Sequence, residues 1–395
     1  MQYHSAERIY QGDGRVLVSK VIAVDNNGRI DALLDRDACN GLDVQMHGGI
    51  ITPGFVNTHC HLELSHMKSK VDTGTGLIPF ISNVVKFRDI PQGQIDAEIK
   101  AGDQEMFEAG IVAVGDISNK ADTLAVKRNS KMRYYTFVEM FDFMQSAMTE
   151  SAIQQYEEVY AQHDNNSKDK KTRVPHSPYS VSRDLYKHIA ENTNSQETIS
   201  IHNQETPAEN EMFLEGSGDF FDFFAGFGFP LKDFKGIGKT SVHNIIENLP
   251  TNRKLLLVHN SLSTPKDIEA AESHFDQVYW ASCPNANMYI ENILPNYKHF
   301  IEAGSKVTLG TDSLTSNWQL SILEEMKTIL KYQSYLSFDT VIQWATKNGA
   351  EALGFADDLG TIEVGKKPGL VHIDAVVQGD SVEISKATSR RLDVQ

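Results

Sequence analysis

Apolar residues along the 395-residue chain form short strand-like segments that alternate with longer stretches compatible with helices. From about residue 50 onward, this alternation is typical of βα units around a parallel sheet. Eight segments have the length and apolar character of buried strands: residues 50–56, 111–116, 132–140, 173–176, 198–202, 254–259, 278–283 and 306–312. Because eight parallel strands in roughly 250 residues are what a TIM-type barrel requires, we predict an α/β protein built on a (β/α)₈ barrel.

The two ends of the chain have a different pattern. Both the first fifty residues and the tail after about residue 355 consist of short β-rich segments separated by turn residues, such as Asp25-Asn26-Asn27-Gly28. We therefore predict two domains. Residues 51–354 form the barrel, which is the catalytic domain, and residues 1–50 and 355–395 together form a small β-sandwich domain.

Charge and composition exclude several classes of protein. The chain has 37 Lys and Arg against 53 Asp and Glu, a net charge of −16, so it lacks the basic surface that a nucleic-acid-binding protein needs. No apolar run reaches the roughly 18 to 20 residues of a membrane-spanning helix. The N-terminal residues do not resemble a signal peptide, and three cysteines without a close pair do not indicate disulfides. We expect a cytoplasmic protein.

Histidines and acidic residues recur where the predicted strands end. They are His59, His61, His176, His202, Glu205, His259 and Asp312. Catalytic residues of (β/α)₈ enzymes gather at the carboxyl ends of the strands. Since side chains two apart in an extended segment point the same way, His59 and His61 can face one cation together. Imidazoles with a carboxylate suit Zn²⁺, Fe²⁺ or Mn²⁺, so we predict a metal centre at this end of the barrel.

The segments around these residues resemble the amidohydrolase superfamily, and in particular its aminohydrolase branch. Residues 49–63 are similar to the first-strand motif of that superfamily, and further matching segments are residues 176–182, 201–205, 258–260, 283–287 and 310–313. The branch includes deaminases of adenine nucleosides, guanine and cytosine, as well as chlorohydrolases. One departure is Ala286, which stands where the branch usually has a serine.

The resemblance implies a ligand set and catalytic roles. It implies one divalent metal, most simply zinc, with iron or manganese as alternatives, held by His59, His61, His202 and Asp312. Glu205 would act as the proton shuttle. His259 would contact the attacking water or the substrate, and Asp312 would accept a proton from that water.

The resemblance also implies a substrate class. Residues 61–66, 283–290 and 310–317 look most like deaminases of aminodeoxyfutalosine, an adenine nucleoside of menaquinone biosynthesis that carries a benzoate arm. The implied reaction replaces the 6-amino group with oxygen and releases ammonia. Alternatives are deamination of S-adenosylhomocysteine, methylthioadenosine or guanine, and a chlorohydrolase-type reaction. A non-catalytic binding scaffold is the alternative from a different class.

Five further residues are candidates for substrate binding. They are His176, Glu139, Arg88, Asn287 and Phe80. His176 stands at a strand end without being needed for the metal, and an aromatic residue and a cation would suit a benzoate. Six phenylalanines within residues 216–230 form either an aromatic lid or apolar packing against the barrel. We expect a small molecule as the partner, no nucleic acid and no membrane, and the sequence is compatible with a homodimer.

Overall fold

Eight parallel strands form the middle of the protein in the computed structural model, which describes residues 1–392. The first sheet contains β8 (Phe55–Cys60), β9 (Ile111–Ser118), β10 (Arg133–Met140) and β11 (Lys170–Pro175). The second contains β12 (Thr198–Asn203), β13 (Lys254–His259), β14 (Gln277–Ser282) and β15 (Lys306–Leu309). Within each sheet, neighbouring strands follow one another in the chain, as repeated βα units require.

Backbone hydrogen bonds join the two sheets at both edges. At one edge, the amide of His202 donates to the carbonyl oxygen of His176 over 3.0 Å. At the other, the amides of Thr311 and Asp312 both donate to the carbonyl oxygen of His59 over 3.0 Å. These contacts bring together strand ends that are far apart in the sequence, and the predicted site residues lie on them.

Helices connect the strands and cover them. Their bounds are α1 (Leu77–Phe87), α2 (Gln92–Glu108), α3 (Leu124–Asn129), α4 (Thr149–Gln162), α5 (Arg183–Glu191), α6 (Pro207–Glu215), α7 (Asp219–Gly226), α8 (Val242–Asn248), α9 (Pro265–His274), α10 (Pro284–Ile290), α11 (Tyr297–Ala303), α12 (Ile322–Tyr332), α13 (Phe338–Ala345) and α14 (Lys347–Ala352). Local sequence explains where some of them begin. Thr264 and Asp267 form a capping box at α9, for example. Within residues 1–392, no helix combines the length and apolar character needed to cross a membrane.

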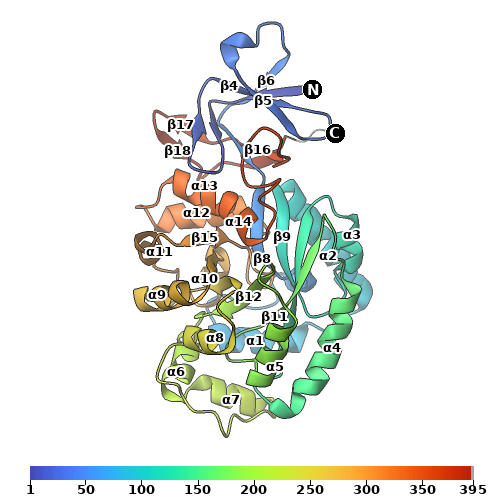
Figure 1. Cartoon of the computed structure of the whole chain (residues 1–395), viewed down its shortest axis with the longest axis vertical. Helices are drawn as coiled ribbons and strands as arrows, with labels where there is room; N and C mark the ends of the chain where they lie inside the picture. The colour runs from blue at the N-terminus through green and yellow to red at the C-terminus, as the bar shows by residue number, and fades with distance from the viewer. Residues whose placement is uncertain (393–395) are drawn as a thin grey trace.

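Both ends of the chain contribute to the remaining sheets. A five-stranded sheet in the order β19-β16-β7-β2-β3 combines the two ends, with β2 (Arg8–Tyr10), β3 (Val16–Leu17), β7 (Ile50–Pro53), β16 (Leu370–Ile373) and β19 (Ser389–Arg391). A four-stranded sheet contains β1 (Gln2–Ser5), β4 (Lys20–Val24), β5 (Ile30–Asp35) and β6 (Val44–Met46), and a hairpin contains β17 (Val376–Gln378) and β18 (Ser381–Glu383). Apolar side chains from both ends, including Ile9, Ile22 and Leu370, share one buried cluster. In Figure 1 these sheets and both termini lie at the top.

The strand predicted over residues 50–56 is in fact two strands. β7 pairs with the terminal strands β2 and β16, whereas β8 starts at Phe55 and pairs with β9. The break falls at Pro53-Gly54. Proline has no amide hydrogen to donate, and a side chain at Gly54 would place its Cβ only 2.2 Å from Cγ1 of Val112. The chain therefore leaves one sheet and enters the other at this point.

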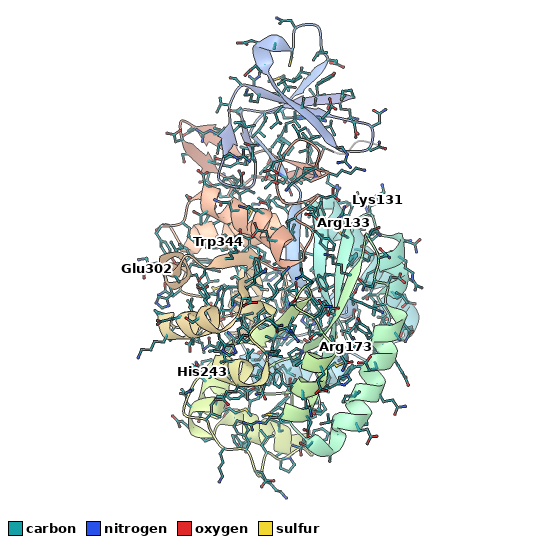
Figure 2. The ribbon with its side chains drawn as sticks, in the orientation of Figure 1. Lys131, Arg133, Arg173, His243, Glu302 and Trp344 are labelled. Carbon is teal, nitrogen blue, oxygen red and sulfur yellow. The ribbon has the colours of Figure 1, made fainter. Side chains whose placement is uncertain are left out.

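The strand carboxyl ends point away from the terminal sheets. Arg133 is the first residue of β10 and Arg173 lies near the end of β11; Figure 2 shows Arg133 nearer the terminal sheets and Arg173 farther from them. α6 and α7 lie at the bottom of Figure 1, on the side toward which the strands run. The polar residues at the strand ends therefore lie on the same side of the protein as α6 and α7.

Candidate metal and active site

Three imidazoles and one carboxylate converge where the two parallel sheets meet. The Nε2 atom of His61 lies 3.2 Å from Nε2 of His59 and 3.4 Å from Nε2 of His202. Oδ1 of Asp312 lies 3.5 Å from Nε2 of His61 and 3.6 Å from Nε2 of His59. All four side chains are buried. The structure thus brings together the four residues that the sequence nominated as metal ligands, from β8 and the residue after it, from β12 and from the loop after β15.

The donor atoms of this cluster fit a divalent metal ion. Nδ1 of His202 donates to the carbonyl oxygen of His176 over 2.7 Å, so Nε2 of His202 carries a lone pair and faces the other imidazoles. The hydroxyl of Ser316 donates to Oδ2 of Asp312 over 2.5 Å, which leaves Oδ1 directed at the histidines. Three nitrogen donors and one carboxylate oxygen form the kind of set that binds zinc and related divalent metals.

Unusual backbone conformations aim two of the functional side chains. Asp312 has a φ of +56° and His259 a φ of +72°, in the left-handed region that residues other than glycine rarely adopt. Each residue ends a strand or follows one closely, and hydrogen bonds from the Asp312 and Asn260 amides hold the turns. Strain of this kind is characteristic of functional sites, where the surrounding structure maintains it. The last parallel strand ends at Leu309, short of Asp312, which the sequence predicted as its last residue.

Glu205 and His259 lie side by side next to the metal cluster. Oε1 of Glu205 is 3.5 Å from Nε2 of His259. On the other side of the ring, Nδ1 of His259 donates to Oδ1 of Asn287 over 2.8 Å. Because Asn287 contacts His259 and does not line the cavity described below, the structure places it behind the histidine, away from the substrate position that the sequence suggested.

Burial and neighbouring charges push two carboxyl groups in opposite directions. Burial raises the pKa of Glu205 well above its usual value, and the negative charges of Asp312 and Glu209 add to the effect. Burial would also raise the pKa of Asp312, but the close approach of His59, at 3.6 Å, and the interactions with His61 and His259 outweigh it, so the pKa of Asp312 lies far below its usual range. Glu205 therefore favours the protonated form and Asp312 the carboxylate, an arrangement that suits an acid and a base in one site.

A cavity of about 390 Å³ opens onto these residues. Its wall is mainly apolar, and many of the contributing side chains come from α1, α7 and the loop after β10: Leu77, Phe80, Ile81, Val84, Phe141, Phe143, Phe223, Phe224 and Phe227. The predicted residues Phe80, Arg88, Glu139 and His176 all line it. Sequence reasoning missed Phe141 and Phe143. They follow the end of β10, so the strand-end rule that found the histidines could also have found them.

Arg88 contributes a positive charge to this cavity wall. It directly follows α1, and its Nη2 lies 4.0 Å from Oε1 of the buried Glu63. Burial raises the pKa of Glu63 to about 7, against the opposing effect of the Arg88 charge. Oε2 of Glu63 accepts from the backbone amides of Asn119 and Lys120. The guanidinium is thus loosely paired at the cavity edge, which leaves it available to an anionic ligand.

Parallel βα units, with a cluster of imidazoles and a carboxylate that fits a divalent metal at the carboxyl ends of the strands, are typical of metal-dependent hydrolases. Residues 50–390 match the amidohydrolase family, so the chain belongs to the amidohydrolase family and is a hydrolase acting on C–N bonds. This confirms the family predicted from the sequence.

Individual relatives are more distant. Aminodeoxyfutalosine deaminase of a Nitratiruptor species is 28% identical over 338 residues, covering 82% of this chain and 79% of the relative. A 5-methylthioadenosine/S-adenosylhomocysteine deaminase of Bacillus cereus is 27% identical over 381 residues, covering 92% and 81%. Among solved structures, Helicobacter pylori aminofutalosine deaminase in complex with methylthio-coformycin has a TM-score of 0.79 at 23% identity, covering 94% of this chain and 91% of that one. The likeness to that structure shows the fold.

Proposed function

We propose that the protein is a metal-dependent hydrolytic deaminase of an adenine-type nucleoside, with aminodeoxyfutalosine as its substrate. The observation that carries this proposal is the buried Glu205 beside a cluster of three imidazoles and one carboxylate, at the base of an apolar cavity. The names of the relatives support the same reaction.

The chain's own residues account for the proton transfers. A divalent ion held by His59, His61, His202 and Asp312, with zinc favoured by the nitrogen-rich donor set, would supply a water of lowered pKa at neutral pH. Asp312 accepts the proton that this water loses. Glu205 donates its proton to a ring nitrogen, which makes the amine-bearing carbon electrophilic. It then takes the second proton of the attacking water and passes it to the amine, which leaves as ammonia, and the proton held by Asp312 restores Glu205. His259, held by Asn287, directs Nε2 toward the attacking water.

The residues of the cavity wall suit a substrate with an aromatic, anionic arm. Phe223, Phe224 and Phe227 of α7 and the residue after it provide aromatic surface, and Phe227 is 42% exposed, so it can cover a ligand that enters the cavity. Arg88 offers a guanidinium that can bind a carboxylate. A benzoate-bearing nucleoside satisfies both features, and an unsubstituted adenosine satisfies neither.

A second candidate is deamination of methylthioadenosine or S-adenosylhomocysteine. The apolar cavity wall would accommodate a methylthio group, and the Bacillus cereus relative covers 92% of this chain. Methylthioadenosine carries no acid group for Arg88, and S-adenosylhomocysteine carries a carboxylate but no aromatic ring for α7 to cover. The two candidates therefore differ in the contribution expected from the phenylalanines, and methylthioadenosine differs also in the contribution expected from Arg88.

We also infer a closed architecture for the catalytic part. The hydrogen bonds at both edges of the two parallel sheets support a single (β/α)₈ barrel. The two sheets built from the chain ends support a small β-sandwich domain made of residues 1–50 and 355–395, with residues 51–354 as the barrel. A small molecule is the partner that the cavity suits.

A substrate panel tests the proposal. Purified zinc-loaded protein is incubated with aminodeoxyfutalosine, methylthioadenosine, S-adenosylhomocysteine and adenosine, and both ammonia release and the loss of adenine absorbance are followed. We expect the highest kcat/KM with aminodeoxyfutalosine. Absence of ammonia from every compound would contradict deamination, and a higher kcat/KM with methylthioadenosine would favour the second candidate.

A variant tests the proton donor. Glu205→Gln keeps the size of the side chain but removes its proton, so we expect unchanged zinc content and a loss of kcat of about 10²- to 10⁴-fold. Glu211→Gln on the exposed face of α6 is the matched control and should retain full activity. Full activity in Glu205→Gln would show that another group transfers the proton.

A further inference from the structure

A second cluster of polar side chains adjoins the metal cluster and shares His202 with it. One ligand atom from each of Glu139, His176 and His202 lies within 4.8 Å of the other two. Glu139 comes near the end of β10 and is only 2% exposed. Its Oε1 is 2.8 Å from Nδ1 of His176 and 3.4 Å from Nδ1 of His202, while its Oε2 accepts from the side-chain amide of Asn119 over 3.2 Å.

This second cluster does not suit a second metal ion. Nδ1 of His202 donates to the carbonyl oxygen of His176 over 2.7 Å, so that nitrogen carries a hydrogen and has no lone pair for a metal. The other nitrogen of His202 belongs to the first cluster. What remains is a buried carboxylate that faces the hydrogen-bearing side of one imidazole and the Nδ1 atom of another.

The carboxylate determines how His176 meets the cavity. A negative oxygen 2.8 Å from Nδ1 favours the tautomer with the hydrogen on that atom. His176 is 27% exposed on the side chain and lines the cavity, so Nε2 is the nitrogen left for a ligand. The aromatic rings of Phe141 and Tyr179 flank the imidazole at centroid distances of 5.8 and 6.3 Å and restrict its rotation.

We propose that Glu139 is a positioning residue shared by two histidines, which orients His202 toward the metal and at the same time presents Nε2 of His176 to the bound substrate. The carboxylate of Glu139 therefore fixes the orientation of one histidine at the metal centre and of another in the cavity wall. Glu139 itself does not need to touch the substrate. The statement about the substrate rests on the proposed function, whereas the statement about the metal does not.

A structural contrast supports the assignment. Elsewhere in the chain, Glu157 also lies 2.8 Å from a histidine nitrogen, Nε2 of His188, but that pair bridges α4 and α5 and does not line the cavity. The side chain of Glu157 is 29% exposed and is paired with Arg173 as well. Of these two carboxylate–histidine pairs at 2.8 Å, the one at Glu139 joins a metal-site histidine to the cavity wall.

The first test measures zinc affinity and needs no substrate. The holoenzyme and its Glu139→Gln, His176→Gln and Glu157→Gln variants are depleted with a chelator and titrated with zinc. We expect Glu139→Gln to lose about 10- to 100-fold in zinc affinity, as other outer partners of metal ligands do. His176→Gln and the matched control Glu157→Gln should stay within about twofold of the wild type, since neither variant removes a side-chain partner of His202. Unchanged zinc affinity in Glu139→Gln would overturn the role assigned toward His202.

The second test uses the zinc-loaded enzymes and the best substrate of the panel. We expect Glu139→Gln and His176→Gln each to raise KM by about tenfold or more, and the double variant to raise it no further than the larger single effect. Additive effects on KM would show that Glu139 does not act through His176. Nitrogen NMR of the histidine rings provides a readout that remains valid if no nucleoside is deaminated. Glu139→Gln should change the tautomer of His176, and an unchanged tautomer would contradict the proposal.

Glu139→Asp keeps the proposal testable if Glu139→Gln fails to fold. This variant retains the charge but draws the carboxylate back by one methylene group. Zinc affinity should fall and KM should rise, in the same directions as for Glu139→Gln. Wild-type values of both quantities would overturn the proposal.

Discussion

At the scale of single residues, neutral hydrogen-bonding partners decide which atom of each functional side chain faces the site. Ser316 occupies one oxygen of Asp312, and Asn287 occupies one nitrogen of His259. Each of these hydrogen bonds fixes one orientation of the functional side chain, so that the other oxygen of Asp312 and the other nitrogen of His259 face the site. Their side chains contribute to the chemistry only through the groups that they hold.

Asn287 provides a test at this scale. Asn287→Leu keeps the approximate volume but leaves Nδ1 of His259 without its acceptor, so the imidazole can turn or change tautomer. We expect kcat to fall about 10- to 100-fold, in the range seen when the outer partner of an active-site histidine is removed, with zinc content unchanged. Steady-state kinetics and metal analysis check this. Wild-type kcat in Asn287→Leu would show that the contact is dispensable.

The site residues show how far the sequence could be used at this scale. His59, His61, His202, Glu205, His259 and Asp312 were found from their position at strand ends, and the structure places them in one cluster or beside it. Asn287 was also found, but its side chain points at His259 and away from the cavity. Position along a strand predicts the end of the sheet to which a residue belongs. It does not predict the direction of a side chain in the helix that follows.

At the scale of elements, the short helices α1 and α7 form much of the cavity wall in front of the metal cluster. α1 and α7 contact each other and belong to an apolar cluster separate from the main core. Both helices place aromatic or aliphatic side chains in the cavity wall. Glycines with positive φ flank α7, at Gly218 before it and Gly228 after it, so the helix is bounded by turns.

Substitutions in and directly after α7 should change substrate selectivity. A double variant of Phe223→Ala and Phe227→Ala removes aromatic surface that would cover the substrate arm. Loss of this burial should raise KM for aminodeoxyfutalosine by about tenfold or more and leave KM for adenosine unchanged. Kinetics on the two substrates measure the difference, and Leu214→Ala on the exposed face of α6 is the control. An equal rise for both substrates would place these side chains outside the arm-binding region.

α3 carries a buried ion pair that predicts a stability effect. Nζ of Lys127 lies 2.6 Å from Oδ2 of Asp116, and both side chains are buried. Asp116 also accepts from the amide of Leu62, directly after His61. Removing one member of a buried pair leaves an uncompensated charge, so Lys127→Met should lower the free energy of unfolding by about 3 to 5 kcal/mol.

Urea denaturation measures this loss. The control Lys131→Met alters an exposed lysine close by in the chain and should change the free energy of unfolding by less than about 0.5 kcal/mol. A similarly small change in Lys127→Met would mean that the pair contributes little to the folded state.

At the scale of the whole molecule, the two chain ends are joined by polar contacts as well as by shared sheets. His47 follows β6, and its Nε2 lies 3.2 Å from Nδ1 of His4 on β1. Its Nδ1 lies 3.3 Å from a guanidinium nitrogen of Arg390 on β19. Because Arg390 can only donate, Nδ1 of His47 accepts, and the chain of contacts requires His47 to be neutral.

This cluster predicts how stability depends on pH. Burial lowers the pKa of His47 to about 4, and the charges of His4, His372 and Arg390 contribute to the shift. The pKa of His47 in the folded protein lies below its unfolded value of about 6.5. The contribution of neutral His47 to the free energy of unfolding is therefore fully present above about pH 6.5 and is lost as the pH falls toward about 4. The Tm measured between neutral pH and the folded pKa should decrease less steeply in His47→Gln than in the wild type. Parallel curves for the two proteins would contradict this.

Local properties of the protein follow from its sequence alone. The period of apolar residues located eight parallel strands, and the polar residues at their ends located the site, because both follow from the geometry of a single strand and from the way parallel strands share one edge. Contacts between distant segments set the division of residues 50–56 between two sheets, the cavity wall built by α1 and α7, and the contact of Glu139 with two histidines. Each of these depends on which distant segment packs against which, and a local period along the chain carries no information about such partners.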